Sequence, residues 1–161
     1  MADASDIKEL FVLHGYTPAE ISSEFGFNYE YVAKIVEPHL PTRDQQAVLR
    51  EKWLIGSEFG RDRDKYSYGE WYEHADREAE KLGIRRHTLL QFIAIARFPL
   101  TEYAFCRSHS SAYNRSCRLR RVVKNDFNPD KVNEMLEQWR KQPTRDYGQI
   151  QSTLTHVAEF D

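Results

Sequence analysis

The segment from Thr17 to Val36 constrains the fold most, because its residues predict two short helices joined by a tight turn. Thr17 can cap a helix with its hydroxyl, and Pro18 suits the first helical position, where no amide hydrogen is needed. Glu20 stands where a capping-box carboxylate returns to the Thr17 amide. Gly26 can then end this first helix, because glycine readily adopts the left-handed conformation found at helix termini.

A second helix and a preceding one complete the pattern. Asn28 can cap a helix over residues 29–37, and residues 3–14 supply an earlier amphipathic helix. Ser22 is small enough to let the two short helices cross closely. The apolar side chains that would converge on one interior are Ile21, Phe25, Phe27, Val32 and Ile35. Residues 1–40 are therefore expected to form one three-helix module.

This spacing resembles the helix-turn-helix motif of phage repressors and bacterial regulators, with Ser22 at the small position and Gly26 at the turn. Val32 and Ile35 match the buried positions of its recognition helix. The resemblance implies that this helix enters a DNA groove. The residues expected to read or approach base edges are Asn28, Tyr29, Tyr31 and Lys34.

The charge of the module opposes contact with a phosphate backbone. Residues 1–40 hold Lys8 and Lys34 against seven carboxylates, so their formal charge is −5. Such a surface contributes little electrostatic affinity for DNA. Either other parts of the chain hold the DNA, or this hairpin binds a protein.

Composition narrows the class of protein. With 161 residues, 40% of them hydrophobic and 30% charged, the chain can bury a core in one domain or two small ones. No apolar run approaches membrane-spanning length, and no signal peptide opens the chain. Cys106 and Cys117 are too few for a disulfide framework, which fits a reducing compartment. We therefore expect a cytoplasmic protein without membrane contact.

The rest of the chain also has helical patterns. Thr42 opens a helix expected to end at Gly56, and a charged linker follows. A capping box at Ser67 opens the next helix, which Gly83 should end. Further helices are expected over residues 85–97 and 130–141. The predicted units are the module at 1–40, a connecting helix and linker at 41–66, a helical body at 67–142 and a tail at 143–161.

A second turn, at Gly83, resembles the first one. Arg85 and Arg86 begin the following helix, where they could reach phosphates, and Gln91 could pair with adenine. The preceding helix is longer than in most such motifs, and the apolar run that follows suits a buried helix. A second DNA-reading motif and an ordinary core hairpin therefore both remain open.

The strongest basic feature lies between residues 100 and 125, where six cations face only Glu102, for a net charge of +5. An arginine-rich segment with few acids favours binding to phosphates or to an acidic protein surface. This stretch could form a helix, or a short strand in a basic wing. The expected phosphate contacts are Arg107, Arg115, Arg118, Arg120, Arg121 and Lys124, together with Arg85 and Arg86.

Catalytic and metal-binding patterns are weak. Cys106, His109 and Cys117 could offer three zinc ligands, but their spacing matches no common structural site. The chain has no glycine-rich phosphate loop, HExxH metal motif or serine-elbow motif. We therefore expect no enzymatic activity, no metal and no cofactor.

Together these features predict an all-α protein that binds double-stranded DNA without catalysis, as a transcriptional regulator of bacterial or phage type. A homodimer or higher homo-oligomer is expected, because one such module buries too little surface to specify a site. One alternative is a phage DNA-packaging subunit of small-terminase type, which the chain resembles only in its size, its helical character and its N-terminal helix-turn-helix. Another is an inhibitor of a host enzyme, whose acidic module docks a basic protein.

Overall fold

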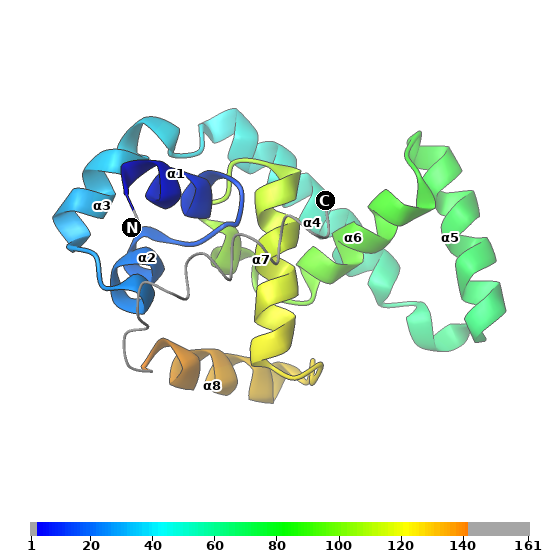
Figure 1. Cartoon of the computed structure of the whole chain (residues 1–161). Helices are drawn as coiled ribbons and strands as arrows, with labels where there is room; N and C mark the ends of the chain where they lie inside the picture. Colours follow the sequence, from blue (N-terminus) through cyan, green and yellow to red (C-terminus); the bar gives the residue numbers. More distant parts are fainter. Residues whose placement is uncertain (1–2, 142–161) are drawn as a thin grey trace.

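The computed structural model describes residues 3–141, and every regular element within them is helical (Figure 1). The predicted all-α fold is confirmed. The helices are α1 (Ala4–Val12), α2 (Pro18–Phe25), α3 (Tyr29–Val36), α4 (Arg43–Gly60), α5 (Tyr68–Leu82), α6 (Arg86–Ala96), α7 (His109–Val122) and α8 (Pro129–Arg140). Short 3₁₀ helices are η1 (Glu37–His39), η2 (Arg63–Lys65) and η3 (Leu100–Tyr103). The tail predicted at 143–161 lies outside the described residues.

Helices α1, α2 and α3 form an N-terminal module around their own core. The predicted capping box is present, because Glu20 N donates to the Thr17 hydroxyl and Thr17 N donates to the Glu20 carboxylate. Gly26 ends α2 with a φ of 77°, and the Asn28 side chain caps α3. The core side chains are Ile7, Leu10, Phe11, Tyr16, Ile21, Phe25, Val32 and Val36.

Helix α4 continues through Gly56 to Gly60, which corrects the predicted helix end at Gly56. Here α4 crosses α6 so closely that a Cβ added to Gly56 would lie 2.0 Å from the carbonyl oxygen of Phe92. The glycine therefore permits a tight helix crossing and does not end the helix. The expected linker shrinks to the short turn around η2.

Helices α5 and α6 form a hairpin at the opposite end of the molecule from the module (Figure 1). Gly83 ends α5 with a φ of 71°, as its position predicted. The capping box at Ser67 is not formed, because the Ser67 hydroxyl donates to Glu70 and caps no backbone amide. The hairpin core comprises Phe59, Trp71, Ala75, Ala79, Leu89 and Phe92.

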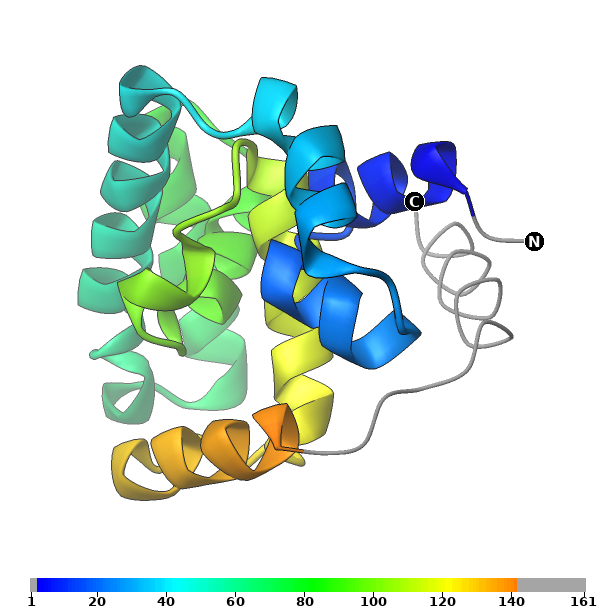
Figure 2. The ribbon, with the colours of Figure 1, turned by 90° about the vertical axis from the view of Figure 1, so that its left-hand side faces the viewer.

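Helix α7 stands at the centre of the molecule, between the module and the α4–α6 pair (Figures 1 and 2). Its 14 residues settle the alternative left open for the basic segment, which is helical and forms no strand. The largest core surrounds α7 and α8, and includes Leu49, Ile95, Phe98, Tyr103, Leu119, Val123, Leu136 and Trp139. None of the described helices is long and apolar enough to cross a membrane.

Candidate nucleic-acid interface

The outer face of α3 carries the side chains that the helix-turn-helix resemblance assigns to the DNA groove. Tyr29 and Tyr31 are 53% and 47% exposed, and Asn28 and Lys34 are also exposed. The inner face is anchored by Val32, which is fully buried. The module therefore presents α3 outward. The Asn28 oxygen already accepts a hydrogen bond from the Tyr31 amide, so its NH₂ group is the part that could reach a base.

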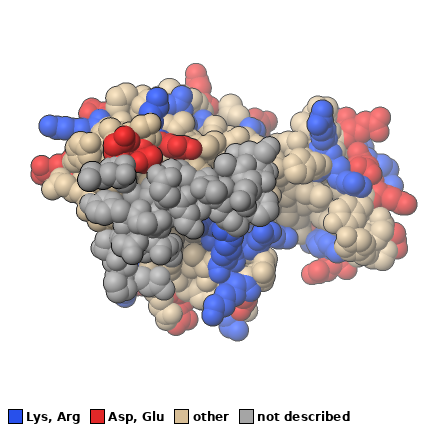
Figure 3. Space-filling model, in the orientation of Figure 1, with Lys and Arg blue, Asp and Glu red and all other residues tan. Residues whose placement is uncertain are grey.

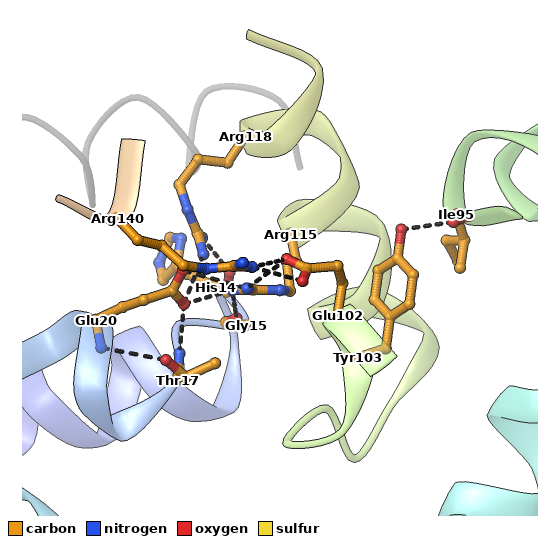
Figure 4. Close-up of polar contacts among 10 residues, drawn as sticks. All are labelled: His14, Gly15, Thr17, Glu20, Ile95, Glu102, Tyr103, Arg115, Arg118 and Arg140. Atoms are coloured by element: carbon orange, nitrogen blue, oxygen red, sulfur yellow. Dashed lines mark hydrogen bonds and ion pairs between the residues drawn. The ribbon is translucent and has the colours of Figure 1, made fainter. Parts of the chain in front are cut away.

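A buried ion-pair network joins the module to α7 (Figure 4). Arg115 is 1% exposed, and its guanidinium donates to Glu20 at 2.5 Å and to the Gly15 carbonyl at 2.9 Å. Glu102, which lies in η3, stands 3.3 Å from Arg115 and also pairs with Arg140 at the end of α8. The carboxylate that caps α2 therefore also holds the module against the body.

The network fixes the charges of its members. Burial alone would raise the pKa of Glu20, but the charges of Arg115 and Arg118, with hydrogen bonds from Arg115 and Thr17, hold it at about 2. Burial works against the charge of Arg115 in the same way, and Glu20 and then Glu102 outweigh it and raise the pKa of this guanidinium. Both partners therefore stay charged at neutral pH.

Two further polar side chains of α7 bind the loop between α1 and α2. Arg118 donates to the His14 carbonyl at 2.9 Å, and its guanidinium lies 3.5 Å from the centre of the Tyr16 ring. Asn114 donates to the Leu13 carbonyl at 3.0 Å. These contacts act together with the Glu20 pair to hold the module against α7, and the rings of Phe11 and Phe105, 6.5 Å apart, add an aromatic contact with the body.

The structure corrects the expectation that Arg115 and Arg118 contact phosphates. Arg115 is buried, and the Arg118 side chain is only 14% exposed. A guanidinium that pairs with a buried carboxylate would leave an uncompensated charge if it turned outward. Two of the six cations of the predicted basic segment thus serve the interior contact between the module and the body.

The remaining cations of α7 lie on the surface beside the end of α6. Arg97 and Arg120 are exposed and line one pocket together with Phe127, whose ring centre lies 4.5 Å from the Arg97 guanidinium. Partial burial, and then the charge of Arg120, lower the pKa of Arg97. Within residues 3–141 neither arginine pairs with a carboxylate. Arg121 and Lys124 are also exposed. We call these four residues, Arg97, Arg120, Arg121 and Lys124, the α6–α7 basic patch; Figure 3 shows cations over the C-terminal half of α7.

The α5–α6 hairpin has fewer side chains free to contact DNA than the sequence predicted. The two ends of the Gln91 amide are engaged, at 3.0 Å from His87 and 2.6 Å from His109. These bonds and the packing of α6 against α4, α5 and α7 correct the expectation that Gln91 reads a base. Arg86 pairs with Asp76 at 3.3 Å. Arg85 is exposed, but it lies on the hairpin and not on the patch.

The predicted site residues are thus distributed over several surfaces. Helix α3 lies at the left edge of Figure 1, whereas Figure 3 shows cations over the C-terminal half of α7, near the centre of the molecule. Arg107 lies in a third place, between α4 and the start of α7. Sequence reasoning missed Arg97, although a cation directly after the last apolar residue of a buried helix is a signal for a surface position.

The three possible zinc ligands do not form a site. Cys106 is buried in the central core, and Cys117 is a half-buried free thiol. Among residues 3–141 no group of three or more His, Cys, Asp or Glu side chains could hold a metal ion.

No protein-family model, no curated protein and no solved structure matches this chain. The function proposed below therefore rests on the residues and geometry of the protein itself.

Proposed function

We propose that this protein binds double-stranded DNA without catalysis, as a transcriptional regulator of bacterial or phage type. The observation that carries the proposal is the outward face of α3, where Tyr29, Tyr31 and Lys34 are exposed on a helix anchored through Val32. Helix-turn-helix proteins use this arrangement to bring a recognition helix to the major groove.

The α6–α7 basic patch supplies the electrostatic part of the affinity. On α3, Lys34 is accompanied by the exposed carboxylates of Glu30 and Glu37, so this helix attracts phosphates poorly. Arg97 and Arg120 repel each other, and a phosphate between them would relieve that repulsion. Affinity and recognition thus belong to different helices in this proposal.

The two surfaces belong to different parts of the molecule. Helix α3 lies at the left edge of Figure 1, whereas the cations of α7 that Figure 3 shows lie near its centre. A duplex that bends around the module, or one held between two copies of the chain, reaches both surfaces. We include a homodimer in the proposal, since paired modules double the sequence that is read.

Fluorescence anisotropy with duplex DNA across a salt series tests the proposal. We expect binding to weaken steeply with salt. In the double variant Arg97→Gln with Arg120→Gln, the plot of log affinity against log salt should become shallower, with a slope smaller in magnitude by about 1 to 2. A variant of equal charge loss, Lys65→Gln with Lys81→Gln, removes cations that pair with acids elsewhere and is expected to keep the wild-type slope.

Two outcomes would reject parts of this function. The absence of binding at low salt would reject DNA as the partner. Equal slopes in the patch variant and its control would remove the patch from the interface. Size-exclusion chromatography with light scattering would give the oligomer, and a ring in place of a dimer would favour the packaging subunit of small-terminase type.

A second function is favoured by the acidic charge of the same module. Glu30 and Glu37 are exposed near Tyr29 and Tyr31, a combination suited to a basic protein surface. Glu30→Lys with Glu37→Lys separates the two functions. If α3 faces the duplex, DNA affinity rises by about tenfold or more in this variant, because phosphate repulsion is replaced by attraction. Unchanged DNA affinity would favour the protein-binding function.

A further inference from the structure

A cavity of about 290 Å³ lies between α4 and the start of α7. Its volume is at the lower end of the range of about 300–1,000 Å³ found for ligand pockets, so it suits a small molecule. The wall from α4 includes the apolar side chains of Val48 and Leu49. The other residues that line it are Asp44, Gln45, Lys52, Arg107, Ser108 and His109.

Two cations enter this cavity from different elements. Lys52 comes from α4, and its Nζ atom lies 5.9 Å from the centre of the Phe92 ring. Arg107 comes from the residues before α7 and contacts His39 at 3.4 Å. Neither cation pairs with a carboxylate in the part of the chain that the structure describes. Two such charges around one hollow favour an anionic ligand.

Helix α7 begins at the same cavity. The Ser108 hydroxyl accepts a hydrogen bond from the Ser111 amide, but the first amides of a helix have no acceptor within it. The first turn of α7 also contains no acidic residue that would compete for these donors. The helix dipole adds partial positive charge at this end.

His109 also lines the cavity, and its hydrogen bonds leave one ring nitrogen without a partner in the described residues. Gln91 donates to His87 through its NH₂ group, so its oxygen accepts from Nε2 of His109 at 2.6 Å. The Nδ1 atom of His109 is then an acceptor, and it is buried without a hydrogen-bond partner among residues 3–141. Burial, with Lys52 and His87 nearby, lowers the pKa of His109.

We propose that this cavity binds a small phosphate monoester, whose oxygens pair with Lys52 and Arg107 and accept from the first turn of α7. A phosphate monoester has three acceptor oxygens and nearly two negative charges, which match two cations and several backbone donors. Val48 and Leu49 contact the organic part of the ester, and Asp44, which also lines the cavity, leaves the two cations in excess by one charge. The inference does not depend on DNA binding, since it uses neither α3 nor the α6–α7 basic patch.

Isothermal titration calorimetry of the full chain with phenyl phosphate tests the proposal near neutral pH. We expect saturable binding that weakens by about tenfold or more in Lys52→Gln and in Arg107→Gln, because each removes a charge-assisted contact. Arg50→Gln is the matched control, since it removes an exposed cation of α4 that does not line the cavity. Thermal unfolding of each variant verifies that it is folded.

The proposal would be overturned if the wild-type chain showed no saturable binding of phenyl phosphate. It would also be overturned if both cavity variants bound phenyl phosphate as tightly as the wild type. Displacement of phenyl phosphate by an unphosphorylated duplex would assign the cavity to the DNA backbone and not to a small ligand. Binding of phenyl phosphate that is unaffected by the duplex supports the small phosphate monoester. Since the titration contains no DNA, a failure of the proposed DNA binding would leave its result unchanged.

Discussion

Glu20 accepts hydrogen bonds from two parts of the chain that are far apart in sequence. One donor is the Thr17 amide at the start of its own helix, and the other is Arg115, which is 95 positions away. A single carboxylate thus starts α2 and fixes the module against α7. Ion pairs of this kind cost free energy to desolvate, but the loss of one partner leaves the other charge buried.

We predict that Glu20→Gln lowers the free energy of unfolding by about 3 kcal/mol, the lower end of the range for breaking a buried pair. The amide keeps one hydrogen bond to Arg115, and Glu102 keeps part of the charge balance. Urea unfolding measures the change. Glu30→Gln serves as the control, because Glu30 is exposed on α3 and makes no ion pair within the described residues. A loss below about 0.5 kcal/mol, the level of ordinary surface substitutions, would contradict the prediction.

The pKa of Glu20 also predicts how stability depends on pH. Its folded-state pKa of about 2 lies below its ordinary value of 4.5, so the unfolded chain takes up this proton more readily. The stabilisation is complete above pH 4.5 and is lost as the pH falls toward 2. The difference corresponds to about 3 kcal/mol. Urea unfolding of wild type and Glu20→Gln should therefore show stabilities that converge as the pH falls, and parallel curves would disprove this assignment.

Among the helices, the α4–α6 crossing sets the tightest steric limit. We predict that Gly56→Ala destabilises the fold by about 1–3 kcal/mol, because the new methyl group would overlap the Phe92 carbonyl and force the helices apart. Gly69→Ala is the matched control in α5, where nothing lies within 4 Å of the added Cβ. There alanine should stabilise the helix by up to about 1 kcal/mol. Thermal unfolding measures the stability of both variants. Equal stability changes in the two would contradict the steric limit predicted at the α4–α6 crossing.

The helix ends could be predicted from the sequence, whereas the contacts between distant helices could not. The caps at Thr17, Gly26 and Gly83 were predictable, because their hydrogen bonds and backbone angles involve residues within a few positions. The role of Gly56 was not, since a glycine that ends a helix and one that admits another helix have the same local sequence. The burial of Arg115 was hidden in the same way, because its carboxylate partner belongs to a distant helix.

For the molecule as a whole, three separate hydrophobic clusters share one connecting helix. The module, the central core and the α5–α6 hairpin each have their own buried side chains. Helix α7 reaches the module through Glu20, His14 and Gly15 and packs on α6 and α8 through its apolar side. Loss of the Glu20 charge should therefore loosen the contact between the module and α7. The packing of the α5–α6 hairpin, which is apolar, should be unaffected.

Hydrogen exchange monitored by mass spectrometry tests this organisation. In Glu20→Gln we expect faster exchange of amides in α1, α2 and α3, because the module loses the contact that holds it to α7. Exchange in α5 should stay at the wild-type rate, since that helix packs through Phe59, Trp71 and Ala75 and shares no contact with Glu20. Gly56→Ala is the complementary control, because it disturbs α4 and α6 and should accelerate exchange in the hairpin while the module keeps its protection. A uniform increase over all helices in both variants would mean that the chain opens as one cooperative unit, and the division into an electrostatically attached module and an apolar body would be wrong.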